Sequence, residues 1–447
     1  MKTLLTFFIL SVLSVPVFSQ DFDKAKLDQF FDALSANNKG MGSIAISKDG
    51  KILYSRAVGF SHYGEKEKVS SDAKTKYRIG SITKMFTATL VFGFVEEGKL
   101  KLDDTLDKFF PAIPNAKKIT VAQMLNHHSG IHNITDDAQN YYSYYRRPQR
   151  HEQMLDVIAK TTPDFEPGAK AAYSNSNYIL LGYIVEKVSG KSYKDLLNQK
   201  ITSKINLTDT FYGGQINDAN NESYSFDWVE GDWKILAETD MSVPGGAGGI
   251  VSTPTDLTKF ITALFDGKLV SQKSLFQMKT ISDGYGSGVL QFPYDDKKLF
   301  GHTGGIDGFN SMLVYLPEEK LSVAYISNGT VYPVNDILLA AFAVYYKKPF
   351  TIPSFKPLEY SAEELAKFTG VYSTAAIPIK ITVSVKDKKL FAQATGQSEF
   401  PLEAADKNKF KFEAGGIEVE FNTEKSTMTL QQGGQTFVFT KEPATKK

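Results

Sequence analysis

The sequence SITKMFTATLVF, residues 81–92, joins a short polar motif to an apolar run. If the run is a helix, Ser81 and Lys84 lie one turn apart on the same face. An amine held beside a hydroxyl can make a serine nucleophilic without a histidine. The first helical turn also offers backbone N–H groups without intrahelical acceptors, which favour a nearby oxyanion. The stretch therefore predicts a candidate nucleophile at the start of a helix that runs to about Glu97 and stops at Gly98.

The Ser-x-x-Lys motif is short, and the sequence contains a second copy at Ser71 and Lys74. That copy lies in a polar stretch with no apolar run behind it, so we expect it in an exposed loop. For Ser81, a purely structural interpretation is a helix N-cap followed by a surface lysine. The motif alone does not separate this interpretation from a catalytic one.

The composition is that of a globular protein. Of 447 residues, 42% are hydrophobic and 23% are charged. The formal net charge is +1, and no long block of like charge indicates nucleic acid or an anionic membrane as a partner. The absence of cysteine excludes disulfides, thiol nucleophiles and cysteine-based metal sites. Since the sequence has no His-Glu-x-x-His motif either, we expect no metal and no cofactor.

The N-terminus has the pattern of a signal peptide. Lys2 precedes an apolar run at residues 4–13, and Ser19 is a small residue at the expected cleavage position. The run is short for a transmembrane helix, although an uncleaved anchor is the alternative. We expect residues 1–19 to be a signal peptide, and the mature chain to be periplasmic or secreted without a transmembrane segment.

Hydrophobic patterning divides the rest of the chain in two. A hairpin over residues 42–58 and strands within residues 309–328 enclose a mostly helical region. This order predicts an α+β domain, residues 20–348, in which the first hairpin and the last strands share a sheet. Composition changes at residues 347–353, the best linker candidate. Short alternating strands separated by glycine turns then predict a small all-β domain, a sheet or barrel, at residues 349–447.

A second motif, Tyr173-Ser174-Asn175, is the only Tyr-x-Asn in the sequence and follows a Pro-Gly turn. Tyr173 could relay the proton of Ser81 if an ammonium such as Lys84 lowered its pKa. Asn175 could fix the lysine or bind a substrate amide. The structural alternative makes Asn175 a helix N-cap and Tyr173 a packing residue.

A third motif, Gly301-His302-Thr303-Gly304-Gly305, precedes a predicted strand. Glycines beside a histidine and a threonine indicate a backbone that a ligand approaches closely. The N–H of Gly305 is a candidate oxyanion donor. The alternative is a glycine-rich turn with incidental polar residues.

Taken in order, the three motifs resemble those of the serine β-lactamase and penicillin-binding protein superfamily, and most of all its class C β-lactamase and D-Ala-D-Ala carboxypeptidase branch. There the elements are Ser-x-x-Lys, Tyr-x-Asn and Lys/His-Thr-Gly. The resemblance covers roughly residues 25 to 345. Its supporting stretches are residues 124–131, 166–168 and 247–253. The C-terminal part, with its stretch FTGVY at residues 368–372, is similar to small lipocalin-like domains appended to some of these hydrolases.

The resemblance implies roles for the first two motifs. Ser81 would be the acylated nucleophile and Lys84 its proton acceptor or relay. Tyr173 would be the partner base and would protonate the leaving group. Asn175 would bind the substrate amide and Lys84.

For the third motif, the resemblance implies substrate contacts by His302, Thr303 and Gly304. The N–H groups of Ser81 and Gly305 would form the oxyanion hole. Two departures from the family pattern matter. His302 stands where the β-lactamase motif has a lysine, so a positive charge there becomes pH dependent, which argues against a dedicated β-lactamase. Gly305 stands where a small hydroxyl residue is frequent, which removes one substrate contact.

The expected fold is a β-lactamase/transpeptidase-like α+β domain, an antiparallel sheet flanked by helices plus a helical subdomain, followed by a small all-β lipocalin-like domain. The expected activity is that of an exported serine hydrolase that forms an acyl-enzyme on amides or esters, foremost a D-amino-acid peptidase or carboxypeptidase. An esterase or β-lactamase on the same residues is the close alternative. A penicillin- or peptidoglycan-binding protein without turnover is the alternative of another class. The substrate would be a small peptide, ester or β-lactam.

Overall fold

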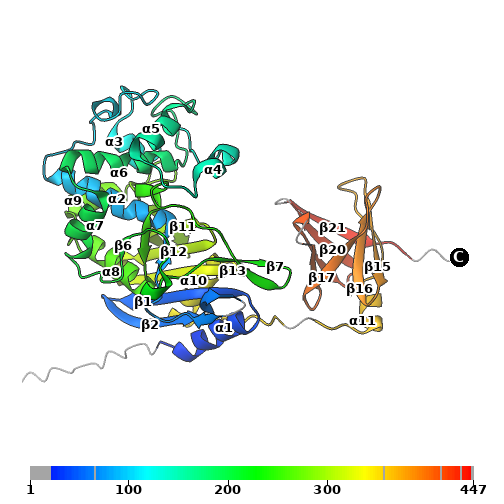
Figure 1. Cartoon of the computed structure of the whole chain (residues 1–447). Coiled ribbons are helices and arrows are strands. Elements are labelled where there is room, and N and C mark those ends of the chain that lie inside the picture. The colour runs from blue at the N-terminus through cyan, green and yellow to red at the C-terminus, as the bar shows by residue number, and fades with distance from the viewer. Residues whose placement is uncertain (1–21, 65–66, 356–357, 413–414, 433–434, 444–447) are drawn as a thin grey trace, which may run out of the picture. The chain divides into compact units, whose positions relative to one another are not determined.

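The computed structural model describes residues 22–64, 67–355, 358–412, 415–432 and 435–443. The predicted signal peptide, residues 1–19, lies outside the described residues. The chain divides into two compact units between Pro353 and Ser354 (Figure 1). The domain boundary expected after residue 348 lies a few residues before this division.

A six-stranded antiparallel sheet forms the base of the first unit. The hairpin of β1 (Gly40–Lys48) and β2 (Lys51–Val58) turns at Asp49 and Gly50, both at positive φ, as an Asp-Gly hairpin turn requires. Strand β1 also pairs with β13, so the first hairpin and the last strands share one sheet, as predicted. The strand order is β10 (Leu290–Tyr294), β11 (Lys297–Ile306), β12 (Phe309–Leu316), β13 (Leu321–Thr330), β1 (Gly40–Lys48) and β2 (Lys51–Val58).

Helices pack against this sheet. α8 (Pro254–Phe265) contacts β1, β12 and β13. α1 (Lys24–Ala36) and α10 (Val334–Tyr345) contact each other and the sheet. Shorter pairings in the described part of the unit are β3 (Phe60–Tyr63) with β4 (Lys68–Ser70), β9 (Ile250–Ser252) with β5 (Tyr77–Arg78) and β6 (Phe211–Tyr212), and β7 (Phe226–Val229) with β8 (Asp232–Ile235).

The helical subdomain is built around α2 (Thr83–Glu96). This helix is apolar on every side, and such a helix is stable only when it is buried. Its residues from Thr83 to Phe92 are all buried, and Phe86 stacks on Phe260 with ring centroids 3.7 Å apart. α2 packs against α6, which brings the first two motifs together (Figure 1). The other helices here are α3 (Val121–Leu125), α4 (Ala138–Tyr144), α5 (His151–Ala159), α6 (Asn175–Ser189), α7 (Tyr193–Leu197) and α9 (Gln272–Met278).

The second unit is a closed eight-stranded antiparallel barrel preceded by α11 (Ala362–Ala366). Side chains alternate along its strands, and the buried set, which includes Phe410, Phe421 and Phe439, forms one hydrophobic core. The alternating pattern therefore predicted this part correctly, and pairing of the first strand with the last closes the barrel. The strands are β14 (Gly370–Ser373), β15 (Lys380–Lys386), β16 (Lys389–Ala394), β17 (Phe400–Asp406), β18 (Lys409–Phe412), β19 (Ile417–Asn422), β20 (Thr427–Gln432) and β21 (Gln435–Lys441).

Among the described residues, no helix has both the length and the apolar character needed to cross a bilayer.

Candidate active site

Ser81 lies in a single 3₁₀ turn, Gly80–Ile82, that leads directly into α2. The interpretation of Ser81 as an N-cap is wrong, because the N-cap of α2 is Ile82 and makes no side-chain cap hydrogen bond. The turn lies against β11. Gly80 has φ +49°, and a Cβ there would meet the backbone nitrogen of Gly305 at 2.8 Å. A glycine is therefore required for this close approach between the serine turn and the strand.

The second Ser-x-x-Lys copy behaves as predicted. Ser71 follows β4 in a loop, and the side chain of Lys74 is exposed. The two copies differ in what lies behind them, since only the one at Ser81 continues into a buried helix.

Lys84 is completely buried and reaches three acceptors. Its Nζ lies 2.9 Å from Ser81 Oγ, 2.8 Å from Asn175 Oδ1 and 2.9 Å from the carbonyl oxygen of Ala247. Burial lowers the pKa of Lys84 well below its ordinary 10.5. A neutral amine here would donate two hydrogens to the amide and the carbonyl, and would direct its lone pair at the serine oxygen.

Tyr173 approaches Ser81 from another direction. Its hydroxyl donates to Ser81 Oγ at 2.7 Å, and Lys84 Nζ lies 4.8 Å from the centre of its ring. Burial raises the pKa of Tyr173 above its ordinary 10, although the hydrogen bond with Ser81 acts in the opposite direction. The hypothesis that the ammonium of Lys84 lowers this pKa is wrong. Tyr173 is therefore a neutral hydrogen-bond donor, and Lys84 is the stronger candidate for the base.

Asn175 is the first residue of α6, after the N-cap Ser174, so it is not the cap itself. Its Oδ1 faces Lys84, while its Nδ2 donates to Asn133 Oδ1 at 3.2 Å and to Thr135 Oγ1 at 3.1 Å. Its backbone N–H donates to the same Asn133 oxygen at 3.0 Å. These contacts fix the amide with its oxygen toward the lysine. No spacing in the sequence pointed to Asn133 or Thr135.

The third motif lies on β11 and is not a glycine-rich turn. A Cβ on Gly304 would lie 2.1 Å from the carbonyl oxygen of Ile79 and 3.0 Å from the nitrogen of Ser81, so the strand presses on the serine turn. Both Ser81 and Gly305 line one cavity, so their backbone N–H groups stay candidate oxyanion donors. Thr303 lies beside them on the strand, half-buried.

His302 differs from its prediction. It is 2% exposed, and its Nδ1 lies 2.5 Å from the carbonyl oxygen of Thr303. Burial, together with the positive charge of Lys84, lowers the pKa of His302 to about 3. The expected pH-dependent positive charge at this position is therefore wrong, because the ring stays neutral near neutral pH.

His127 is a residue to which the sequence assigned no role. Its ring packs on Tyr173 with centroids 4.7 Å apart and also contacts Tyr178 and Tyr285. Its Nδ1 accepts the backbone N–H of Ser174 at 3.1 Å. Burial and the charge of Lys84 lower the pKa of His127 well below 6.5, so this ring is neutral as well. It holds Tyr173 in place, a role that the resemblance of residues 124–131 to the family does not by itself predict.

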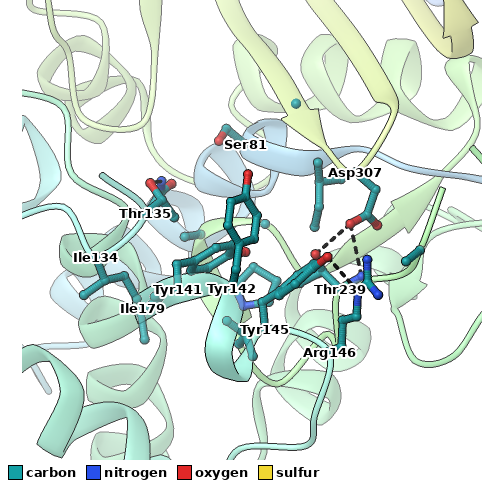
Figure 2. Close-up of a pocket in the computed structure, with 18 of the residues that line it drawn as sticks. Ser81, Ile134, Thr135, Tyr141, Tyr142, Tyr145, Arg146, Ile179, Thr239 and Asp307 are labelled. Carbon is teal, nitrogen blue, oxygen red and sulfur yellow. Dashed lines mark hydrogen bonds between the residues drawn. The ribbon is translucent and has the colours of Figure 1, made fainter. Parts of the chain in front are cut away.

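A cavity of about 340 Å³ opens beside these residues (Figure 2). Ser81, Asn175 and Gly305 line it together with tyrosines of the α4 region, Tyr141, Tyr142 and Tyr145. No motif in the sequence marks these tyrosines as functional, because a short run of tyrosines on one helix has no chemistry of its own. Within the described parts of the chain, no group of three or more His, Asp or Glu side chains could hold a metal ion.

Comparison with known proteins places the first unit in a known family. The sequence model of the family described as Beta-lactamase matches residues 27–345. Penicillin-binding protein 4* of Bacillus subtilis (strain 168) is 25% identical over 457 residues, which cover 92% of this chain and 97% of the relative.

Two solved structures are also similar. A D-stereospecific amidohydrolase from Streptomyces sp. is 27% identical, with a TM-score of 0.63 over 72% of this chain and 98% of its own. The octameric penicillin-binding protein homologue from Pyrococcus abyssi is 25% identical, with a TM-score of 0.67 over 93% of this chain and 100% of its own.

Proposed function

The chain belongs to the beta-lactamase family, and from this premise we propose that it is a serine hydrolase that cleaves amide or ester bonds through an acyl-enzyme on Ser81. One observation carries the proposal. Two hydrogen bonds converge on Ser81 Oγ, 2.9 Å from Lys84 Nζ and 2.7 Å from the Tyr173 hydroxyl. A base and a donor on one serine oxygen are the parts that nucleophilic catalysis without a catalytic histidine needs.

Acylation begins with neutral Lys84. As Ser81 Oγ bonds to the substrate carbonyl carbon, its proton passes to the lysine lone pair. The carbonyl oxygen becomes an oxyanion and is stabilised by the backbone N–H groups of Ser81 and Gly305. The intermediate then collapses, the bond to the leaving group breaks, and Tyr173 gives that group its proton. The proton held by Lys84 then passes to the Tyr173 phenolate, which restores the neutral amine and the neutral phenol.

Deacylation reverses these transfers with water. A water molecule gives a proton to the Lys84–Tyr173 pair and attacks the ester carbon, and Ser81 Oγ leaves with a proton. Asn175 binds the amide of the substrate and keeps Lys84 oriented, since its oxygen lies 2.8 Å from Nζ. Thr303 and Gly304, on the strand beside the serine turn, contact the substrate backbone, and neutral His302 supports that strand.

We favour amides and peptides of D-amino acids as substrates, with a carboxypeptidase-like or amidase-like reaction. The similar proteins support this choice, since one is a D-stereospecific amidohydrolase and another a penicillin-binding protein. A neutral His302 offers no cation to a substrate carboxylate at the motif position, which argues against a dedicated β-lactamase and favours the amidase-like over the carboxypeptidase-like reaction. We also propose export to the periplasm or outside the cell, on the pattern of residues 1–19 alone.

The test is to incubate the full chain with fluorescent penicillin, p-nitrophenyl acetate and N-acetyl-D-phenylalanine amide, and to locate adducts by mass spectrometry. We expect an adduct on Ser81 and turnover of the ester and the amide. Ser81→Ala should abolish both, whereas Ser71→Ala, in the second Ser-x-x-Lys copy, should keep both.

The other outcomes are equally informative. If the protein is not labelled by penicillin and does not cleave the ester, the proposed enzymatic activity is refuted. An adduct that persists in Ser81→Ala would refute the nucleophile. Stable labelling without turnover would make the chain a penicillin-binding module, and ester turnover without amide cleavage would make it an esterase.

A further inference from the structure

The cavity beside Ser81 has an aromatic wall. Tyr141 and Tyr142 lie on α4 and Tyr145 is its C-cap. The rings of Tyr141 and Tyr145 are stacked with centroids 5.5 Å apart, and Tyr142 meets Tyr145 edge-on at 5.3 Å. Figure 2 shows the three tyrosines grouped below Ser81, with Thr135 on one side and Thr239 and Asp307 on the other.

The wall is held in position by its neighbours. Tyr144, the last residue of α4, is buried, and the carbonyl oxygen of Tyr145 accepts the backbone N–H of Asp240 at 2.8 Å. The hydroxyl of Ser242 accepts the backbone N–H of Gln149 at 2.8 Å. Tyr142 lines the cavity and is 66% exposed. An exposed large ring adds no stability to the fold by itself, so its position calls for another explanation. An exposed ring on an anchored helix is suited to contact a ligand.

The lining residues also indicate whether the cavity receives the acyl group or the leaving group of a substrate. Ser81, Asn175 and Gly305 line the cavity, whereas Tyr173 and His302 are not among its described lining residues. In the proposed function, Tyr173 protonates the leaving group, so the leaving group departs on the Tyr173 side. The cavity then receives the acyl half. This step rests on the proposed function.

The charges of the cavity are unequal. Asp307 is 3% exposed as a side chain, and both of its oxygens already accept hydrogen bonds, Oδ1 from Thr239 and Oδ2 from Arg78. It is therefore not open to a substrate cation. Arg146 is exposed, and its Nε donates to the Tyr145 hydroxyl at 2.6 Å. Its positive charge repels an ammonium group on the substrate.

We propose that this cavity is an acyl-side subsite that selects a bulky aromatic acyl group without a positive charge. The apolar side chains of Ile134, Ile179 and Val243 also line the cavity. An aromatic ring bound there exchanges its contacts with water for contacts with apolar walls. An N-acylated aromatic D-amino acid or an arylacetyl group fits this description, and a short acetyl group leaves the wall unused.

The test compares p-nitrophenyl phenylacetate with p-nitrophenyl acetate, and with the 4-aminomethyl derivative of the phenylacetate. For the unsubstituted chain we expect a higher kcat/KM on phenylacetate than on either other ester. Tyr142→Ala should lower the phenylacetate-to-acetate ratio about tenfold, the scale of one lost apolar contact in a pocket. Tyr142→Phe should keep the ratio, because the ring and not the hydroxyl makes the contact. Arg146→Ala should lower the ratio of kcat/KM for the phenylacetate to kcat/KM for its cationic 4-aminomethyl derivative.

Phe276→Ala is the matched control. Phe276 has the same 66% exposure on another seven-residue helix, α9, and does not line the cavity. This variant should keep the ratio of the unsubstituted chain. Equal kcat/KM for acetate and phenylacetate, unchanged by Tyr142→Ala, would overturn the subsite while leaving the hydrolase intact. Absence of turnover on all three esters, together with no adduct on Ser81, would instead overturn the proposed function.

Discussion

Arg78 offers a sharp test of how the serine turn is held, because its guanidinium joins three segments around it. This side chain is 2% exposed and lies three residues before Ser81. It donates to Asp307 Oδ2 at 2.8 Å, to Glu238 Oε2 at 2.7 Å and to the carbonyl oxygens of Thr239 and Gly214 at 2.9 and 3.0 Å. The substitution Arg78→Met keeps most of the volume and removes the charge and the donors.

The expected cost follows from the burial of the two carboxylates. Asp307 is 3% exposed and would remain as a buried charge without a cation, whereas Glu238 is 26% exposed and water can solvate it. Breaking a buried ion pair by removing one partner costs about 3–5 kcal/mol of unfolding free energy. At about 2 °C per kcal/mol for a unit of this size, the melting temperature of the first unit should fall by about 6–10 °C.

Scanning calorimetry of the full chain measures this shift, and the transition of the C-terminal barrel is an internal reference because the barrel is a separate compact unit. Arg56→Met is the matched control. Arg56 also pairs with two carboxylates, Asp28 at 2.6 Å and Asp32 at 2.5 Å, but those side chains are 47% and 67% exposed. Its loss should cost at most about 1 kcal/mol.

A second substitution separates charge from packing. Adding Asp307→Asn to Arg78→Met removes the unpaired charge and should recover part of the lost stability. Equal melting shifts for Arg78→Met and Arg56→Met, or no recovery in the double variant, would refute the reasoning that an unpaired buried carboxylate sets the cost.

Further predictions concern the reaction itself. Tyr173→Phe should lower kcat about 100- to 10,000-fold with little change in melting temperature, because it removes the proton donor on Ser81 Oγ; unchanged steady-state kcat would contradict that role. The kcat/KM profile should rise with pH as Lys84 loses its proton and should level off below pH 10.5, since burial lowers this pKa; a profile still rising at pH 10.5 would exclude Lys84 as the base. His302→Asn should leave the shape of the profile between pH 5 and 8 unchanged, because the ring titrates at about 3; a shifted midpoint would show that it carries charge. Asn133→Ala should lower kcat/KM about tenfold by releasing the amide of Asn175; an unchanged kcat/KM would refute the positioning role.

Local patterns predicted most of the fold. The apolar run behind Ser81 is a buried helix that ends at Glu96, one residue from the expected end. The Asp49-Gly50 turn makes the predicted hairpin, and the last strands of the unit join it in one sheet. These elements can be predicted from the sequence because helical and alternating periodicities and turn residues act over a few neighbouring residues.

The candidate site could be predicted only in part from the sequence. The three motifs indicated Ser81, Lys84 and Tyr173 as a group, and the structure brings their polar atoms within hydrogen-bond distance. The fixing of Asn175 by Asn133 and the carbonyl of Ala247 that faces Lys84 were not predicted. Backbone carbonyls and hydrogen bonds between distant loops leave no pattern in the sequence, so only the folded chain reveals them.

By itself, the sequence determined which chemical groups are present, their order along the chain and the local elements that carry them. Only the tertiary structure decided their protonation. Burial lowers the pKa of Lys84, raises that of Tyr173 and keeps His302 neutral, so Lys84 is the stronger candidate for the base and Tyr173 is a proton donor. The physical reason is that a pKa depends on the loss of solvation and on charges from every packed neighbour. Those neighbours come together only when helix α2, helix α6 and strand β11 meet at the serine turn.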